Sequence, residues 1–238
     1  MVLALTPVAA GMPRAVAPGT LRQTEELVAR SVVRINRRTV YRVRGQVRQA
    51  LNFGTGVIVG EERIDGHREY LILSNEHVAR NERVAGENTL SIAGGFGVKA
   101  PIALETLEID ARRDQALLRT VHCDASFTVP DYVIGLPEGD AKEAVAFTEG
   151  YGNGRFNTLV GDIVSTRSKY WGLRCYRFDK PVGGGQSGAP LVVIGADRKL
   201  YLAALIFCGD DEYTGATPLQ PGKGVLRELE MELRAERL

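Results

Sequence analysis

A serine set among glycines is the residue of this chain best suited to nucleophilic chemistry. Ser187 lies in the stretch GGGQSGAP, residues 183–190. Glycine allows positive φ angles and close backbone approach, so such a loop can present a hydroxyl with backbone N–H groups turned towards the same point. A nucleophile and an oxyanion hole require this arrangement. A lone Gly-x-Ser-Gly is also typical of an ordinary turn, so the interpretation depends on finding a base and an acid elsewhere.

His77 is the histidine best placed to act as a base. It follows the hydrophobic stretch 70–73 and opens a short helical turn, so it should project from the end of a rigid element, as a general base must. His67 lies beside the predicted Asp65-Gly66 turn and is expected to be solvated. His122 lies at a strand end, where a packing or surface role is expected.

Asp114 is the carboxylate best placed to orient that histidine. It directly precedes the apolar run 116–118, and a carboxylate at the mouth of a buried strand loses water and must find a partner. An imidazole is a natural partner, because a carboxylate that holds the ring fixes its tautomer and stabilises its charge. Asp110 and Asp124 remain alternatives. Together the residues occur in the order His, Asp, Ser.

The composition is that of an ordinary globular protein. The 238 residues are 44% hydrophobic and 25% charged, and 30 basic against 29 acidic residues leave a net charge of +1. No global field therefore favours nucleic acid or a membrane. No apolar run reaches the roughly 18 residues of a membrane span. The 27 glycines indicate many turns and favour a β-rich fold.

The cysteines and the N-terminal residues indicate in which cellular compartment the protein is expected. The chain has an odd number of cysteines, and their spacing does not resemble that of metal ligands: Cys123, Cys175 and Cys208. This predicts buried thiols and no metal site, with a Cys175–Cys208 disulfide as the open alternative. Residues 1–10 are apolar without a basic segment and match a signal peptide poorly. Both features favour a cytoplasmic protein; a truncated signal would instead make it secreted or periplasmic.

Short strands separated by turns make up most of the predicted elements. Residues 1–19 are expected to form a flexible or processed arm, residues 20–30 a helix, residues 123–140 a connector and residues 224–238 an amphipathic helix. Six arginines between positions 34 and 48 fall where solvent-facing strand positions are expected. A nucleic-acid groove that uses Tyr41 for stacking is the disfavoured alternative.

Three segments carry a resemblance to a known family. SNEHV (74–78) resembles the T-A-x-H-V element, DQALL (114–118) the D-x-A-L-L segment and GQSGAP (185–190) the G-x-S-G-x-P loop of trypsin/chymotrypsin-like serine proteases. The chain looks nearest to the HtrA/DegP-like branch, without a PDZ domain, over residues 25–235. The resemblance implies an all-β fold of two six-stranded Greek-key barrels, residues 20–128 and 129–238, with the active site between them.

The resemblance also assigns roles. Ser187 would attack the scissile carbonyl, His77 would transfer the proton, Asp114 would orient His77, and the N–H groups of Gly185 and Ser187 would form the oxyanion hole. Substrate binding would fall to Pro181, Val182, Leu205, Ile206, Phe207, Cys208 and Gly209. No carboxylate lies at the expected pocket base, so small or medium apolar P1 side chains are expected. Gln186 replaces the aspartate of trypsin-type zymogens, which disfavours activation by N-terminal cleavage.

The expected function is therefore a cofactor-free serine endopeptidase acting on proteins or peptides. An α/β-hydrolase is a disfavoured alternative, because Ala189 breaks the Gly-x-Ser-x-Gly motif and both partners precede the serine. The remaining alternative is a catalytically inactive protease-fold binding or scaffold protein. No nucleic-acid partner is expected, and the sequence does not give the oligomeric state.

Overall fold

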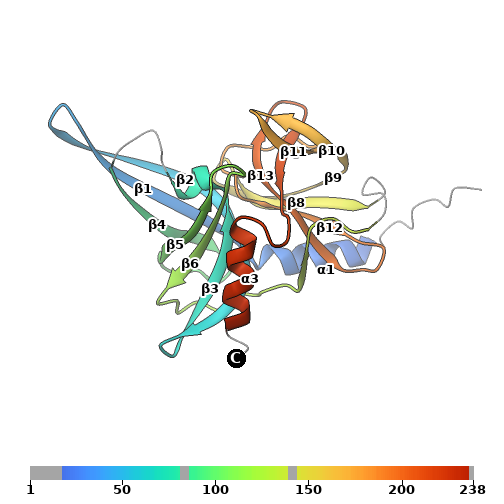
Figure 1. The fold of residues 1–238 in the computed structure, drawn as a ribbon, viewed down its shortest axis with the longest axis horizontal. Coiled ribbons are helices and arrows are strands. Elements are labelled where there is room, and N and C mark those ends of the chain that lie inside the picture. The colour runs from blue at the N-terminus through green and yellow to red at the C-terminus, as the bar shows by residue number, and fades with distance from the viewer. Residues whose placement is uncertain (1–17, 81–85, 139–143, 236–238) are drawn as a thin grey trace, which may run out of the picture.

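The computed structural model describes residues 18–80, 86–138 and 144–235 (Figure 1). The predicted N-terminal arm lies outside these residues except for its last two positions. No helix in the described part of the chain is long and apolar enough to cross a membrane.

Six antiparallel strands close the first barrel in the order β1-β2-β3-β6-β5-β4. They are β1 (Val32–Val43), β2 (Gln46–Ile64), β3 (His67–Ser74), β4 (Gly86–Gly95), β5 (Ile102–Asp110) and β6 (Gln115–Val121). Alternate β-branched and leucine side chains point inwards, and Ile35, Ile58 and Ile72 are fully buried. Asp65 and Gly66 both have positive φ, as the predicted hairpin turn between β2 and β3 requires.

The hairpin of β1 and β2, drawn in blue at the left of Figure 1, projects beyond the rest of this barrel; β4 pairs with β1 as far as Tyr41, so only the tip of the hairpin is two-stranded. β1 is a single strand of 12 residues, paired with β2 along its whole length from Val32↔Val57 to Val43↔Gln46.

The second unit is an eight-stranded sheet with two strands more than expected. Seven strands follow the order β10-β11-β14-β13-β12-β8-β9, and β7 pairs in parallel with β13. They are β7 (Tyr132–Ile134), β8 (Val145–Gly152), β9 (Arg155–Gly161), β10 (Ile163–Tyr170), β11 (Leu173–Phe178), β12 (Pro190–Ile194), β13 (Leu200–Gly209) and β14 (Thr214–Pro218). The predicted connector thus contributes a strand, β7, that binds it to the second unit. The all-β, chymotrypsin-like fold is confirmed.

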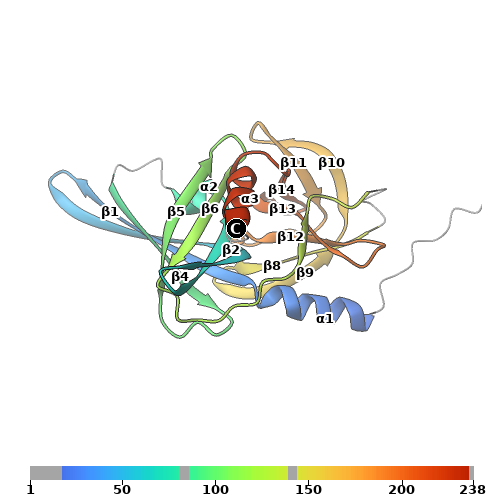
Figure 2. The same cartoon turned by 60° about the horizontal axis from the view of Figure 1, so that its bottom comes forward.

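Three helices complete the chain: α1 (Pro18–Ala29), α2 (Glu76–Ala79) and α3 (Val225–Ala235). Helix α1 begins at a proline, a residue well suited to the first turn of a helix, two positions before the predicted start. Helix α3 packs on β2, β5 and β6 (Figure 2) and buries Val225, Leu226 and Leu229, whereas Met231 is half-exposed.

One hydrophobic cluster joins the two units. It combines Val57, Leu73 and Leu117 of the first barrel with Phe147 and Val192 of the second unit. The loops that leave the strands at this shared core are therefore held at fixed positions relative to one another, which a site built from both units requires.

Candidate active site

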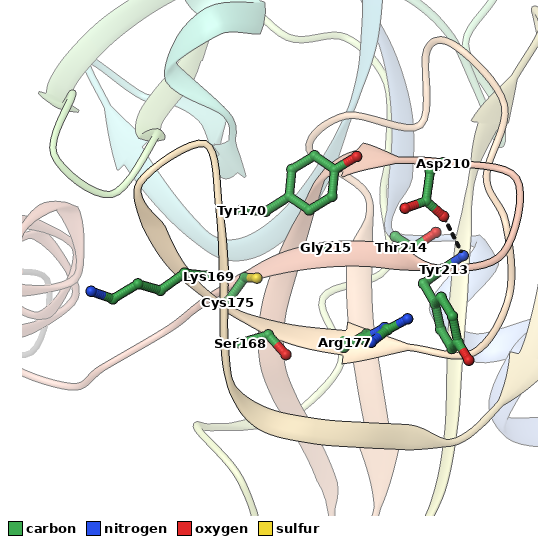
Figure 3. Close-up of a pocket in the computed structure, with 9 residues that line it drawn as sticks. All are labelled: Ser168, Lys169, Tyr170, Cys175, Arg177, Asp210, Tyr213, Thr214 and Gly215. Atoms are coloured by element: carbon green, nitrogen blue, oxygen red, sulfur yellow. Dashed lines mark hydrogen bonds between the residues drawn. The ribbon is translucent and has the colours of Figure 1, made fainter.

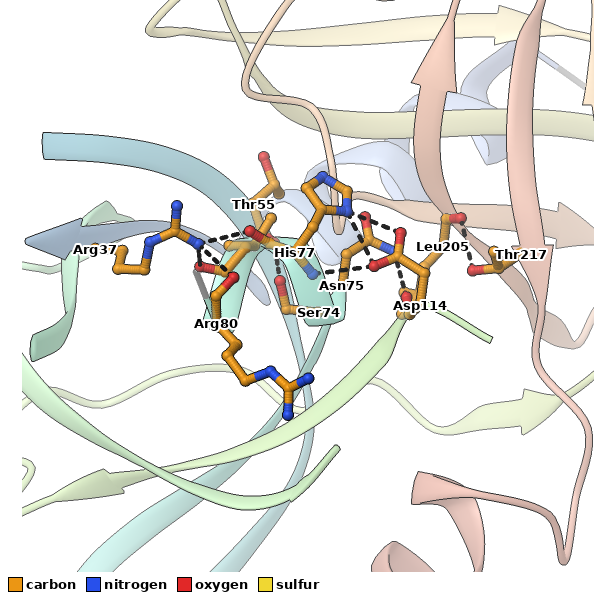
Figure 4. A network of polar contacts seen from close by, with 10 residues as sticks. Arg37, Thr55, Ser74, Asn75, His77, Arg80, Asp114, Leu205 and Thr217 are labelled. Atoms are coloured by element: carbon orange, nitrogen blue, oxygen red, sulfur yellow. Dashed lines mark hydrogen bonds and ion pairs between the residues drawn. The ribbon is translucent and has the colours of Figure 1, made fainter. Parts of the chain in front are cut away.

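The end of β3 positions His77. Residues 69–74 of β3 are all buried, and the chain then turns into the single helical turn of α2. Within α2, Glu76 and Val78 are buried, whereas 46% of the His77 side chain is exposed. The imidazole is thus the accessible group of an otherwise buried element, and Figure 4 shows its ring directed towards Asp114.

Asp114 binds this histidine through both its ring and its backbone. Nδ1 of His77 lies 2.8 Å from Oδ2 and 3.0 Å from Oδ1 of Asp114, and the His77 backbone N–H donates to Oδ1 at 3.0 Å. The side-chain amide of Asn75 donates to the Asp114 carbonyl at 2.8 Å. Since the carboxylate accepts the Nδ1 proton, Nε2 is left free to accept another.

The alternative carboxylates lie elsewhere. Asp110 accepts the backbone N–H groups of Arg112 and Arg113, and it forms an ion pair with the Arg113 guanidinium. Asp124 is exposed. His67 and His122 are also exposed, and their rings lie edge to face with centroids 5.3 Å apart.

Arg37 supports the His77 turn and was missed by the sequence analysis, which treated it as a solvent-facing strand residue. It is 7% exposed, and its Nη1 donates to the backbone carbonyls of His77, Val78 and Arg80 at 2.6, 3.0 and 2.9 Å (Figure 4). Burial lowers the pKa of Arg37, and the nearby Glu76 carboxylate partly offsets this effect. The guanidinium thus takes up carbonyls at the C-terminal end of α2, where a positive charge is favourable.

The Ser187 loop lies between the two units. The carbonyl of Ser187 accepts the Thr55 N–H of β2 at 2.8 Å, and the N–H of Gly188 donates to the Ile206 carbonyl of β13 at 2.7 Å. At Gly54, a Cβ atom would lie 2.5 Å from Val78, next to His77, and 3.1 Å from the Ser187 carbonyl. The structure therefore brings the loop of Ser187 and the turn of His77 to the same point of β2.

Two glycines of this loop cannot be replaced without strain. Gly188 has φ +86°, and a Cβ there would lie 2.0 Å from the Thr55 carbonyl oxygen. Gly185 has φ +96°, and a Cβ there would lie 2.1 Å from the Phe53 ring. Both positions need positive φ and close approach together, which only glycine provides without strain.

The Gly184–Gly185 peptide has a defined orientation. The Gly184 carbonyl accepts the Asn153 N–H at 2.7 Å and so faces the turn between β8 and β9. Because the peptide is trans, the Gly185 N–H points away from that turn. In the described part of the chain, neither the Gly185 nor the Ser187 N–H has a backbone acceptor.

Gln186 fastens the loop from within. It is fully buried; its Oε1 accepts the Gly183 N–H at 3.2 Å, and its Nε2 donates to Asn157 Oδ1 at 2.8 Å. The neutral amide of Gln186 thus holds the loop by hydrogen bonds to the loop backbone and to a side chain of β9. Thr55 adds a further tie, because its hydroxyl donates to the Gly185 carbonyl and accepts the Tyr151 N–H.

The segment expected to bind substrate divides into two parts. Leu205 and Ile206 are fully buried in the core, and the Ile206 backbone is engaged by Gly188 and Ala189. Phe207 and Cys208 are also largely buried, whereas Gly209 is exposed and lies against Val182, whose Cγ2 would be 2.9 Å from a Cβ there. Pro181 is exposed.

A cavity of about 240 Å³ lies beside this segment, between β10, β11 and β14 (Figure 3). Its lining includes Tyr170, Arg177 and Tyr213, and the Arg177 guanidinium stacks over the Tyr213 ring at 3.3 Å. None of the predicted site residues lines it, so it is separate from the His77 and Ser187 region.

The three cysteines are buried and free, as predicted, and the open Cys175–Cys208 bridge is not formed. Cys175, Cys208 and Phe207 form one small apolar cluster. Burial raises the pKa of the Cys208 thiol to about 12, which keeps it protonated and unreactive at neutral pH.

A chymotrypsin-like fold with a hydrogen-bonded His–Asp pair beside a glycine-rich serine loop defines the class of the trypsin-like peptidases. Residues 54–198, more than half of the chain, match the model of the trypsin-like peptidase domain, and the chain belongs to that family. The match contains His77, Asp114 and Ser187. A search of curated proteins found no match to the chain.

Proposed function

We propose that this protein is a serine endopeptidase in which Ser187, His77 and Asp114 form the catalytic triad. The observation that carries the proposal is the 2.8 Å contact between His77 Nδ1 and Asp114 Oδ2, on a turn that meets the Ser187 loop at Gly54. A buried carboxylate that holds Nδ1 leaves Nε2 facing outwards, as a general base for a serine hydroxyl must be.

The reaction would proceed through an acyl-enzyme. Ser187 Oγ attacks the peptide carbonyl while His77 Nε2 takes its proton, and the imidazolium then protonates the leaving amine. Water attacks the ester in the second half, and the same histidine transfers its proton. Asp114 stays ionised throughout and stabilises the imidazolium.

The N–H groups of Gly185 and Ser187 would bind the oxyanion. The bond from Asn153 to the Gly184 carbonyl supports this role, because it turns the Gly185 N–H away from the β8–β9 turn. Gln186 would hold the loop in this form without an N-terminal ammonium group, so no cleavage would be needed for activation. One such donor contributes about 3 kcal/mol to catalysis.

Small or medium apolar P1 residues fit the proposed pocket. Val182 contacts Gly209 across it, and Thr214 fixes the Lys180 carbonyl at its base with a 2.6 Å hydrogen bond. Neither residue offers a charge to a lysine or arginine side chain. The backbone of Phe207–Gly209 would pair with the substrate on the acyl side.

Placement in the HtrA-like branch is part of the same proposal. A helix, α1, precedes the first barrel strand, and the three cysteines are free. Both features agree with that branch and neither is specific to it.

The proposal is tested with casein as substrate. Ser187→Ala should abolish cleavage and leave the unfolding midpoint unchanged, because the substitution removes only the hydroxyl oxygen. Ser126→Ala, at a distant surface serine, is the matched control and should keep full activity. Equal cleavage by wild type and Ser187→Ala would overturn the proposal, and a wild type without activity would favour the binding or scaffold protein.

A further inference from the structure

Apart from Arg37, which supports the His77 turn, the arginines of the β1–β2 hairpin concentrate positive charge that the proposed mechanism does not use. Residues 31–60 contain six arginines and no aspartate, glutamate or lysine. The rest of the chain contains the other 24 basic residues and all 29 acidic residues, so its net charge is −5. The ribbon that projects from the barrel in Figure 1 carries Arg38, Arg42, Arg44 and Arg48 and is therefore more basic than the body of the chain, although Glu87 of β4 lies opposite Val40 beside it.

One face of this ribbon pairs an arginine with each exposed apolar residue. Cross-strand partners share a face, and the register places Arg38 opposite Leu51 and Arg42 opposite Val47. The Arg34 guanidinium lies 4.7 Å from the centre of the Phe53 ring. Phe53, Leu51 and Val47 are 36%, 64% and 57% exposed. Among the described residues, no carboxylate pairs with Arg34, Arg38 or Arg42.

The stripe of Phe53, Leu51 and Val47 begins at the catalytic loop. The Phe53 ring packs on Gly185, and two residues further Thr55 bonds to the carbonyls of Gly185 and Ser187. Ser187 thus lies between β2 on one side and β13 on the other. A substrate whose acyl side pairs with Phe207–Gly209 of β13 would leave the site towards β2.

The outer edge of β2 is also free to pair. Thr55 directs its N–H to Ser187, away from β1, and alternate residues of a strand send their backbone groups to the same edge. Phe53, Leu51, Gln49 and Val47 therefore direct theirs to that outer edge. Among the described strands, none pairs with β2 at that edge before Val57, which lies opposite Leu73 of β3.

We propose that this edge and face of the β1–β2 hairpin bind an extended, acidic polypeptide segment of the substrate that follows the scissile bond. The segment would add a strand to β2, place acidic side chains on Arg38 and Arg42, and place apolar side chains on Phe53, Leu51 and Val47. Open backbone groups favour a polypeptide over a nucleic acid, which cannot form a β-ladder. This inference rests on the proposed endopeptidase function for the direction of the substrate.

Peptides taken from a mapped casein cleavage site test the inference. One peptide ends shortly after the scissile bond, a second continues with alternating Glu and Val, and a third continues with alternating Lys and Val. Two to three exposed charge pairs should raise kcat/KM for the Glu-extended peptide about tenfold over the short peptide. The Lys extension should give no gain, and high salt should remove the gain of the Glu extension.

Two double variants locate the effect. Arg38→Glu with Arg42→Glu should reduce the ratio of kcat/KM for the Glu-extended and short peptides to about one. Arg44→Glu with Arg48→Glu is the control and changes the net charge by the same amount. Arg44 lies at the tip of the hairpin, and Arg48 lies opposite Tyr41 on the other face. This double variant should keep most of the gain in kcat/KM. Equal ratios in the two variants would overturn the proposal.

Direct binding separates this inference from the proposed function. The labelled Glu-extended peptide should bind the Ser187→Ala protein about tenfold more tightly than the Lys-extended one, whether or not the wild type cleaves casein. No preference between the peptides overturns the inference even if cleavage is found. Arg38- and Arg42-dependent binding of a single-stranded DNA oligonucleotide or of a second copy of the chain, without a preference for the acidic peptide, would also overturn it.

Discussion

The two sides of the proposed active site are held in place by different kinds of bond. On the first barrel, His77 is fixed by charged side chains, since the Asp114 carboxylate binds its ring and N–H and the Arg37 guanidinium binds the carbonyls of its turn. On the second unit, Ser187 is fixed by neutral groups, namely the backbone of Thr55 and Ile206 and the amide of Gln186. The base needs a permanent charge beside it, whereas the oxyanion loop needs N–H groups that are not already bound.

Breaking the charged side should have the largest effect. Asp114→Asn keeps the size of the side chain but replaces the acceptor of the Nδ1 proton with a group that can donate, so the wrong tautomer of His77 is favoured. Loss of about 10⁴-fold in kcat is expected on casein-derived peptides, by analogy with the known triads.

Asp110→Asn is the matched control for that prediction. It changes a neighbouring carboxylate that pairs with Arg113 and does not contact His77, so kcat should change little. Similar losses in the two variants would mean that the 110–114 loop matters only for folding.

Glu149, a buried carboxylate on the second unit, differs from Asp114 in its surroundings. Glu149 is 1% exposed and accepts one hydrogen bond, from Thr158, while its Oε2 has no partner among the described residues. Burial, with a smaller effect of Glu25 on α1, raises its pKa from 4.5 to about 8. Unlike Asp114, it has no imidazole or N–H partner in the part of the chain that the structure describes, and it is most stable as the neutral acid.

The pH dependence of stability follows from this raised pKa. Between pH 4.5 and 8 the folded chain keeps a proton that the unfolded chain releases, so the contribution of Glu149 is complete below pH 4.5 and is lost as the pH rises through 8. Glu149→Gln should therefore raise the free energy of unfolding at pH 9 by on the order of 4 kcal/mol and change little at pH 4. Urea unfolding from pH 4 to 9 measures this.

Glu69→Gln is the control for the pH series. Glu69 is also buried, yet it accepts hydrogen bonds from the Thr120 hydroxyl and the His122 N–H. Its replacement should not stabilise the protein at pH 9. Equal pH profiles for wild type and Glu149→Gln would contradict the account of Glu149.

Breaking the neutral side should have a smaller effect. Gln186→Leu removes the bond to the Gly183 N–H and leaves the Asn157 amide without its partner, so the loop should sample forms in which the Gly185 N–H is misdirected. A fall of about 10²-fold in kcat with little change in KM is expected, comparable to loss of one oxyanion donor.

Gln115→Leu separates this positioning effect from a loss of stability. Gln115 is another buried glutamine, and its amide donates to the Pro218 carbonyl. Both variants should unfold more easily, but only Gln186→Leu should lower kcat. If the two variants lose kcat to the same extent, Gln186 has no special role in the loop.

Local patterns predicted much of the fold and pointed to the candidate site. His77 follows a buried strand, Asp114 precedes one and Ser187 lies among glycines, so neighbouring residues alone single them out as candidates. The Asp65-Gly66 turn and the buried strands of the first barrel are equally local features.

The features that the sequence did not predict depend on contacts between segments that are distant in the chain. Arg37 and Arg38 are adjacent arginines on one strand, yet Arg37 points under the His77 turn and Arg38 points to solvent. Glu149 lies in a strand that is buried on both faces, next to β9 and near α1. The residues beside it in the sequence do not indicate this burial. The strand β7 escaped prediction because its parallel partner, β13, lies some 70 residues further along the chain.

Covalent labelling with a fluorophosphonate probe tests the central claim most directly. The account predicts that the probe modifies the full-length protein at Ser187, as located by mass spectrometry, and that Asp114→Asn sharply slows the labelling. A protein that stays unlabelled, or one labelled at another serine, would contradict a triad of Ser187, His77 and Asp114.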